Sequence, residues 1–315
     1  MEQPIKIVVI AGPTAVGKTA FAIETAKRYG GEIVSCDSMQ LYKYMDIGSA
    51  KPTAEEMAQV PHHLVDCVDP LASDGDFSAA KYAALAAEAI RDIHRRGALP
   101  IVSGGTGLYL NGILYDMDFG EQPADPALRA RLNEIAESRG GQPLHDMLRE
   151  KDPQAAERIH PNNVKKVIRA LERLEGGEGS VHDFRQAQTE NPLYDPVLIG
   201  LTRERQELYE RINARVLDMI DRGLVEEVRG LQEMGLSTEY ISMLGIGYKE
   251  ILAFLSGEYS LSEATKIIQK NTRHFAKRQL TWFRRYDKMF WLDISEYADD
   301  TTAMRELFSW LDKKL

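Results

Sequence analysis

The stretch GPTAVGKT at residues 12–19 decides the fold, because it has the G-x-x-x-x-G-K-T spacing of a phosphate-binding loop. The β-branched run IKIVVIA at 5–11 precedes it, and the helical pattern TAFAIETAKRYG at 19–30 follows it. A strand, a tight loop and a helix in this order form the context in which such a loop binds phosphate. The sequence therefore predicts a bound phosphate group at the start of the helix.

Each part of this loop has a chemical reason to be there. Gly12 and Gly17 allow unusual backbone angles, so that successive amide N–H groups and the helix dipole face a phosphate. Lys18 adds a positive charge, and the Thr19 hydroxyl is a ligand for Mg²⁺. The residues expected to surround a diphosphate are Gly12, Pro13, Thr14, Ala15, Val16, Gly17, Lys18 and Thr19.

Apolar segments alternate with helical patterns along the rest of the chain, which predicts an α/β protein with a parallel sheet flanked by helices. The expected strands lie at 5–11, 32–36, 98–103, 197–201 and 289–292. Between 113 and 195 the strand signal disappears, so we expect an all-helical domain inserted into a P-loop core made of 1–112 and 196–315. The glycine-rich segment EGGEGSVHDF at 175–184 is expected to be a flexible tip or hinge.

Composition narrows the class of protein. The formal net charge of −9 argues against a globally basic nucleic-acid binder. Cys36 and Cys67 lack the spacing of a metal site, and two cysteines do not make a disulfide framework. Since the chain has no run of about 18 apolar residues and no apolar leader after MEQPIK, we expect a cytoplasmic protein without membrane contact. We also expect a monomer.

Two local clusters nevertheless run against the acidic average. NVKKVIR at 163–169 is one, and KNTRHFAKRQLTWFRRYDK at 270–288 is the other, with seven Lys or Arg against a single Asp. The second cluster favours contact with a polyphosphate or an RNA backbone. Its aromatic stripe, Phe275, Trp282 and Tyr286, is interpreted as a core-facing stripe.

Ligands of open parallel sheets lie beyond the carboxyl ends of the strands, which directs attention to CDSMQLY at 36–42 and SGGTGLYL at 103–110. Asp37 has three interpretations here: a partner of magnesium, a general base, or a helix N-cap. The glycines of the second segment would let Thr106 and the backbone approach a ligand. On the helical segment 203–223, Arg211, Arg215 and Arg222 either pair with nearby glutamates or clamp a phosphate.

Taken together, GPTAVGKT, DSMQLY, GGTGLYL, RIHPNNVKKVIRALE, GIGYKE and AKRQLTWFRR resemble, in order and over essentially the whole chain, the tRNA dimethylallyltransferases. The resemblance implies transfer of a dimethylallyl group from dimethylallyl diphosphate to N6 of the adenine 3′ to the anticodon. It implies that the loop, with Lys18, Mg²⁺ on Thr19 and Arg215, holds the leaving diphosphate. Asp37 corresponds to the general base proposed for that family.

The same resemblance assigns residues to tRNA. Asp37, Ser38, Met39, Gln40 and Thr106 would contact the flipped adenosine or its neighbours. The remaining tRNA contacts are expected from Arg129, Lys165, Lys166, Val167, Ile168, Arg169, Lys277, Arg278 and Arg284. The family carries Gln-Arg where this chain has Lys165 and Lys166. The resemblance therefore implies contact with the phosphate backbone here, but it does not extend to a base-specific hydrogen bond from the glutamine.

Three other functions fit parts of the sequence. A P-loop small-molecule kinase would use Lys18 and Thr19 on ATP. A dimethylallyltransferase could act on free adenine nucleotides, although the helical insertion and the basic segment favour a macromolecular acceptor. An RNA-binding module without catalysis would tolerate the loss of Asp37.

Overall fold

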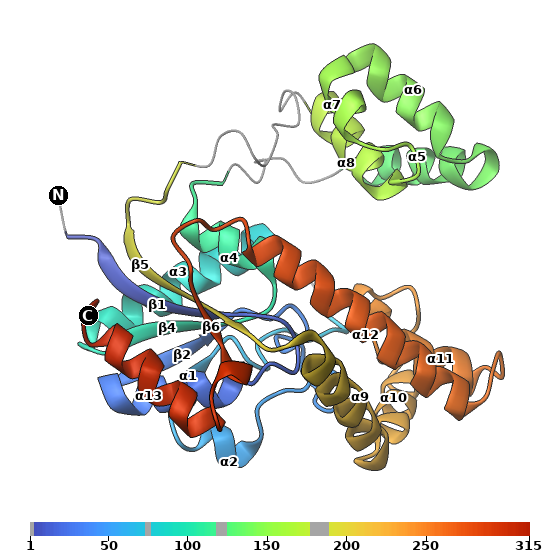
Figure 1. Ribbon diagram of the computed structural model, residues 1–315. Coiled ribbons are helices and arrows are strands. Elements are labelled where there is room, and N and C mark those ends of the chain that lie inside the picture. Colours follow the sequence, from blue (N-terminus) through green and yellow to red (C-terminus); the bar gives the residue numbers. More distant parts are fainter. Residues whose placement is uncertain (1–2, 73–76, 118–124, 177–188) are drawn as a thin grey trace. The chain divides into compact units, whose positions relative to one another are not determined.

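The computed structural model describes residues 3–72, 77–117, 125–176 and 189–315 (Figure 1). The chain divides into two compact units, an α/β unit made of Met1–Leu114 with Asn191–Leu315, and a helical unit, Tyr115–Glu190. These bounds lie within a few residues of the expected ones. Most of the glycine-rich segment expected as a hinge lies outside the described residues.

The α/β unit is built on one six-stranded sheet in which every neighbouring pair of strands is parallel, as predicted. The strand order is β3-β2-β4-β1-β5-β6. The strands are β1 (Ile5–Ala11), β2 (Gly31–Ser35), β3 (His62–His63), β4 (Leu99–Gly104), β5 (Tyr194–Thr202) and β6 (Phe290–Asp293). Strand β1 runs through the middle, so the loop that follows it lies at the centre of the sheet's carboxyl edge.

Helices cover the sheet and extend beyond it (Figure 1). Those of the α/β unit are α1 (Lys18–Tyr29), α2 (Ala54–Met57), α3 (Ala79–Arg95), α4 (Gly107–Leu114), α9 (Arg205–Asp221), α10 (Leu224–Glu233), α11 (Tyr248–Leu255), α12 (Leu261–Phe283) and α13 (Asp300–Leu311), with 3₁₀ turns at Ile241–Leu244 and Ile294–Glu296. Helix α12 begins with a capping box between Ser260 and Glu263. It ends at Phe283, so Lys288 of the basic segment 270–288 lies beyond the helix. None of the described helices is long and apolar enough to span a bilayer.

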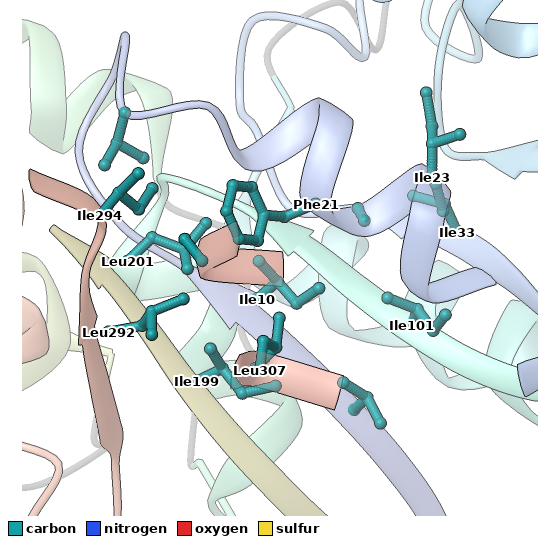
Figure 2. Packing of buried hydrophobic residues seen from close by; sticks show 14 of the residues in the cluster. Ile10, Phe21, Ile23, Ile33, Ile101, Ile199, Leu201, Leu292, Ile294 and Leu307 are labelled. Carbon is teal, nitrogen blue, oxygen red and sulfur yellow. The ribbon is translucent and has the colours of Figure 1, made fainter. Parts of the chain in front are cut away.

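The packing of the core explains why the sequence of β1 is apolar. In Figure 2, Ile10 of β1 packs with Phe21 of α1, Leu201 of β5 and Leu307 of α13. The alternate residues of β1, including Val9, are also almost fully buried, so both faces of the sheet are covered. A strand buried on both faces is continuously apolar, which is the signal carried by residues 5–11.

The point where the chain leaves the α/β unit is closed by hydrogen bonds. The Asn191 amide donates to the Leu114 carbonyl oxygen at 2.9 Å, and the Asn191 side chain donates to the Ile113 carbonyl at 3.1 Å. The end of α4 and the residue that returns toward β5 are therefore direct neighbours.

The helical unit has its own core. Its helices are α5 (Pro126–Arg139), α6 (Gly141–Lys151), α7 (Pro153–Arg158) and α8 (Val164–Glu175). Asp125 and Asp152 cap α5 and α7, each directly before a proline. The core contains Leu132, Leu144 and Leu171. Within the described residues the unit is helical apart from one isolated bridge, which fits the predicted all-helical insertion.

Candidate active site

The loops after β1, β2 and β4 line one cavity of about 720 Å³ in the α/β unit. This cavity joins the phosphate loop (residues 12–19) to the segment after β2 and to the Thr106 loop (residues 104–107). Predicted site residues on its wall are Thr14, Ala15, Gly17, Lys18, Thr19, Asp37, Ser38, Met39, Gln40, Thr106, Arg215 and Arg278. The structure therefore gathers most of the predicted catalytic and diphosphate-binding residues in one place.

The phosphate loop is held in shape by arginines behind it. Arg203 Nε donates to the Val16 carbonyl and Arg211 Nε to the Ala15 carbonyl, both at 3.0 Å. Ala15 has a φ of 65°, a left-handed conformation that an alanine adopts only when its surroundings enforce it. Because both carbonyls are tied back, the loop is preorganised. Arg211 thus supports the loop backbone. The sequence had suggested pairing with a glutamate or clamping of a phosphate for this residue.

Gly12 and Gly17 are needed for different reasons. A Cβ on Gly12 would lie 2.7 Å from the Leu201 carbonyl oxygen, so a larger residue would push the loop off β5. Gly17 has a φ of 114° and directly precedes the first residue of α1. Val16 is fully buried in the core cluster, so its side chain anchors the loop and does not face a ligand.

Lys18 begins α1 and faces the cavity. Its Nζ donates to the Pro13 carbonyl at 2.8 Å, which curls the side chain over the loop. The pKa of Lys18 is lowered to about 8, mainly by burial and to a smaller extent by the nearby Arg215, while the charge of Asp37 acts in the opposite direction. Burial likewise lowers the pKa of Arg215, with Arg211 adding to the effect. Two cations kept close together in a desolvated site are suited to receive a highly charged anion.

Asp37 follows β2 and is fixed by its own turn. Its Oδ1 accepts a hydrogen bond from the Met39 amide at 2.9 Å. Residues 38–41 form turns, so the helix N-cap interpretation was wrong. Lys18 senses the charge of Asp37, so the carboxylate lies near the phosphate loop as the strand order predicts. Burial raises the pKa of the adjacent Cys36 thiol to about 12, which excludes it as a thiolate nucleophile at neutral pH.

Thr106 joins the third loop to the second. Its Oγ1 accepts from the Ser38 amide, and its own amide donates to the Cys36 carbonyl, both at 3.0 Å. The neighbouring glycines make room for protein atoms and not for a ligand. A Cβ on Gly104, Gly105 or Gly107 would collide with the Cys36 backbone, the Gln279 amide or the Trp282 ring, respectively.

Sequence reasoning missed two parts of this site. Gln279 of α12 donates to the Gly105 carbonyl and accepts from the Thr14 amide, both at 2.9 Å. On α10, the Glu227 carboxylate accepts from the amides of Asp46, Ile47 and Gly48 and thereby fixes a turn on the cavity wall. Neither residue has a local pattern that sets it apart from an ordinary polar residue on a helix.

The basic segment of α12 is divided between two tasks. Arg278 lines the cavity and is exposed, as are Lys277 and Arg284. Arg273 instead donates to the Asn213 side chain. Phe275 lines the cavity, so its assignment to a core stripe was wrong, whereas Tyr286 is buried as expected.

The residues of the helical unit that were predicted to contact tRNA differ in burial. Lys165, Lys166 and Arg169 are exposed on α8. Val167 and Ile168 are 0% and 6% exposed and lie in the unit's core, so the prediction that they contact tRNA is corrected for their side chains. The other exposed predicted residue of this unit, Arg129, donates through Nε and one terminal nitrogen to the buried carboxylate of Glu172.

A phosphate loop whose half-buried lysine lies near an arginine and a carboxylate, at the edge of a parallel sheet, defines a P-loop protein that handles a phosphorylated ligand. Residues 40–286 match the IPP transferase family. The chain belongs to this family, and the resemblance to the tRNA dimethylallyltransferases is confirmed.

Relatives match along nearly the full chain. A tRNA dimethylallyltransferase of Alkaliphilus metalliredigens is 50% identical over 294 residues, which is 93% of each chain. One from Caldanaerobacter subterraneus is 47% identical over 99% of each chain. A tRNA isopentenylpyrophosphate transferase from Bacillus halodurans has a similar structure, with a TM-score of 0.73, 45% identity, and coverage of 98% of this chain and 96% of that one. A eukaryotic dimethylallyltransferase, described as acting on tRNA, gives a TM-score of 0.79 at 29% identity. The match covers 96% of this chain and 78% of that one.

Proposed function

We propose that this protein transfers the dimethylallyl group of dimethylallyl diphosphate to N6 of the adenine 3′ to the anticodon in tRNA and releases diphosphate. The observation that carries the proposal is the single cavity shared by Lys18, Arg215 and Asp37. Two cations there suit the leaving diphosphate, and a carboxylate suits the amine that replaces it. Relatives covering nearly the whole chain are tRNA dimethylallyltransferases, which favours this activity over a P-loop kinase.

The transfer has two parts, the departure of the diphosphate and the attack of the adenine N6 on the allylic carbon. The bond between the allylic C1 and the diphosphate oxygen breaks, and its electron pair leaves with the diphosphate. Lys18, Arg215 and the amides at the start of α1 stabilise that developing charge. The N6 lone pair forms the new bond to C1. Because this lone pair is delocalised into the adenine ring, N6 becomes a useful nucleophile only if its proton is removed, and Asp37 accepts it.

The residues present fit a magnesium ion. Thr19 lines the cavity at the first turn of α1, where its hydroxyl supplies one ligand. In the described parts of the chain no three His, Cys, Asp or Glu side chains converge on a metal site. A Mg²⁺ ion bound to Thr19 would therefore take its other ligands from diphosphate and water, a common arrangement for this ion. When bound, it would neutralise charge on the leaving group.

The acceptor adenine is stacked in its loop and must be extruded before N6 reaches Asp37, which costs about a few kcal/mol. Arg278 on the cavity wall and the exposed Lys277 lie on the helix that borders this cavity, and the exposed Arg284 is the C-cap residue of that helix. Contacts from these residues to tRNA phosphates would offset the cost of extrusion. Lys165, Lys166 and Arg169 supply a second basic surface from the helical unit.

The test is incubation with labelled dimethylallyl diphosphate, Mg²⁺ and unmodified tRNA, followed by nucleoside analysis. The proposal expects label on one adenosine and release of diphosphate. AMP serves as the alternative acceptor, and ATP consumption without prenylation would instead support a kinase. The cytoplasmic location and the monomeric state expected from the sequence stay predictions.

A further inference from the structure

We propose that Gln279 is a positioning residue that sets the phosphate loop and the Thr106 loop in register with each other. This inference rests on the proposed function. Gln279 lies in the last turns of α12 and is only 5% exposed. Its Oε1 accepts from the Thr14 amide and its Nε2 donates to the Gly105 carbonyl, each at 2.9 Å. The pairing of β1 with β4 ends at Ala11 and Gly104, and one side-chain amide links the two loops beyond that point.

The polarity of this link is fixed. Thr14 presents a backbone N–H, which needs an acceptor, and Gly105 presents a carbonyl, which needs a donor. The primary amide of glutamine offers both groups at neutral pH, whatever the protonation of its neighbours. Glutamate would keep the acceptor but place a second oxygen against the Gly105 carbonyl, and methionine would keep the length and lose both hydrogen bonds.

The surroundings keep Gln279 in place. A Cβ on Gly105 would collide with the Gln279 side-chain nitrogen, so the Thr106 loop approaches α12 as closely as its backbone allows. One turn further along α12, Trp282 packs against Gly107 in the same way. Tyr286 beyond the helix end hydrogen-bonds the side chain of Asn111 on α4. The end of α12 is thus attached to the Thr106 loop and to the helix that follows it.

Each linked loop serves a different substrate. The phosphate loop holds the donor's diphosphate, and Thr106 is hydrogen-bonded to the segment that carries Asp37, which acts on the acceptor. A transfer requires the acceptor nitrogen and the donor carbon to be held in a reactive geometry, and a misplacement of about 1 Å can reduce the rate about 100-fold. Gln279 acts on that distance without touching the reacting atoms.

The experiment compares kcat and the separate affinities for pyrophosphate and tRNA in three variants. Gln279→Glu is the main variant, and Gln279→Met removes both hydrogen bonds without adding charge. Gln269→Glu is the matched control, because Gln269 lies on the same helix and its amide donates to the Asn213 carbonyl at 3.2 Å, away from both loops. Wild-type transfer to tRNA is measured first and reports on the proposed function independently.

At pH 8 we expect kcat of Gln279→Glu to fall about 100-fold, with both affinities within about threefold of wild type. Burial raises the pKa of a carboxyl at this site, and the protonated carboxyl can donate to Gly105 while accepting from Thr14. The ratio of variant to wild-type kcat should therefore rise at least tenfold as the pH falls from 8.5 to 6. Gln279→Met should show the same loss at every pH, and Gln269→Glu should retain wild-type kcat.

A kcat of Gln279→Met equal to that of wild type would overturn the inference, even if Gln279→Glu fails to fold. A pH-independent loss in Gln279→Glu, or a loss accompanied by equally weakened pyrophosphate binding, would also overturn it. In either case the residue would stabilise the fold and not the register of the two loops.

Discussion

Replacing Lys18 with methionine should abolish a proton uptake that accompanies diphosphate binding. In the ligand-free protein burial lowers the pKa of Lys18 to about 8, Asp37 opposes that effect and Arg215 adds to it. A diphosphate against Nζ stabilises the charged form and raises the pKa again. Binding must then protonate whatever fraction of Lys18 is neutral, which is about 0.1 proton at pH 7, 0.5 at pH 8 and 0.9 at pH 9.

The direction of the pH dependence of diphosphate affinity follows from this coupling between binding and protonation of Lys18. Below pH 8 the lysine is already charged, so affinity for diphosphate is nearly independent of its titration. Above pH 8 the affinity should fall, up to about tenfold per pH unit, because neutral Lys18 must first take up a proton. The loss continues until the pKa of the bound state is passed.

Isothermal titration of the protein with inorganic pyrophosphate, in buffers of different ionisation enthalpy at pH 7, 8 and 9, measures this uptake. Subtracting the values for Lys18→Met cancels the protonation of pyrophosphate itself. Lys27→Met is the control, since Lys27 lies on the same helix and pairs with Glu24. An uptake at pH 8 that is the same in wild type and Lys18→Met, within about 0.1 proton, would refute the reasoning.

Three further predictions concern other parts of the site. Asp37→Ala should reduce single-turnover transfer about 1,000-fold while leaving tRNA affinity within about threefold, and an equal loss of both would remove the general-base assignment. Lys277→Ala should weaken tRNA binding and reduce the slope of log K against log salt concentration by about 0.8. Lys266→Ala, at an exposed position on the same helix, should leave that slope unchanged. Equal slopes for the two variants would exclude Lys277 from the tRNA interface. Arg211→Met removes the hydrogen bond to the Ala15 carbonyl and should weaken pyrophosphate binding at least about tenfold, with unchanged affinity speaking against a preorganised loop.

The sequence was informative where one segment contains its own signal. The run at 5–11 predicted β1 because a strand buried on both faces is apolar along nearly its whole length, here from Ile7 to Ala11. The two-residue β3 was missed, since His62 and His63 carry no apolar pattern. Asp37 and Thr106 could be placed near the phosphate loop because parallel strands end at one edge of a sheet.

Contacts across the chain were not predictable in this way. Gln279 lies 265 residues from Thr14, and an amide inside a basic helix has the appearance of a solvated residue. The left-handed Ala15 was also missed, and the hydrogen bond to its carbonyl comes from Arg211, which lies 196 residues away in the chain. The resemblance to the family supplied the identities of the substrates, which no local pattern contains.

The hydrogen bonds between Asn191 and the end of α4 bear on how the enzyme tolerates changes in length. With the two attachment points already in contact, the helical unit behaves as a large surface loop whose ends are fixed by the α/β unit itself. Doubling the length of such a loop adds only about 0.6 kcal/mol of closure entropy. Residues added to or removed from this insert should therefore leave the pairing of the strands around β1 intact.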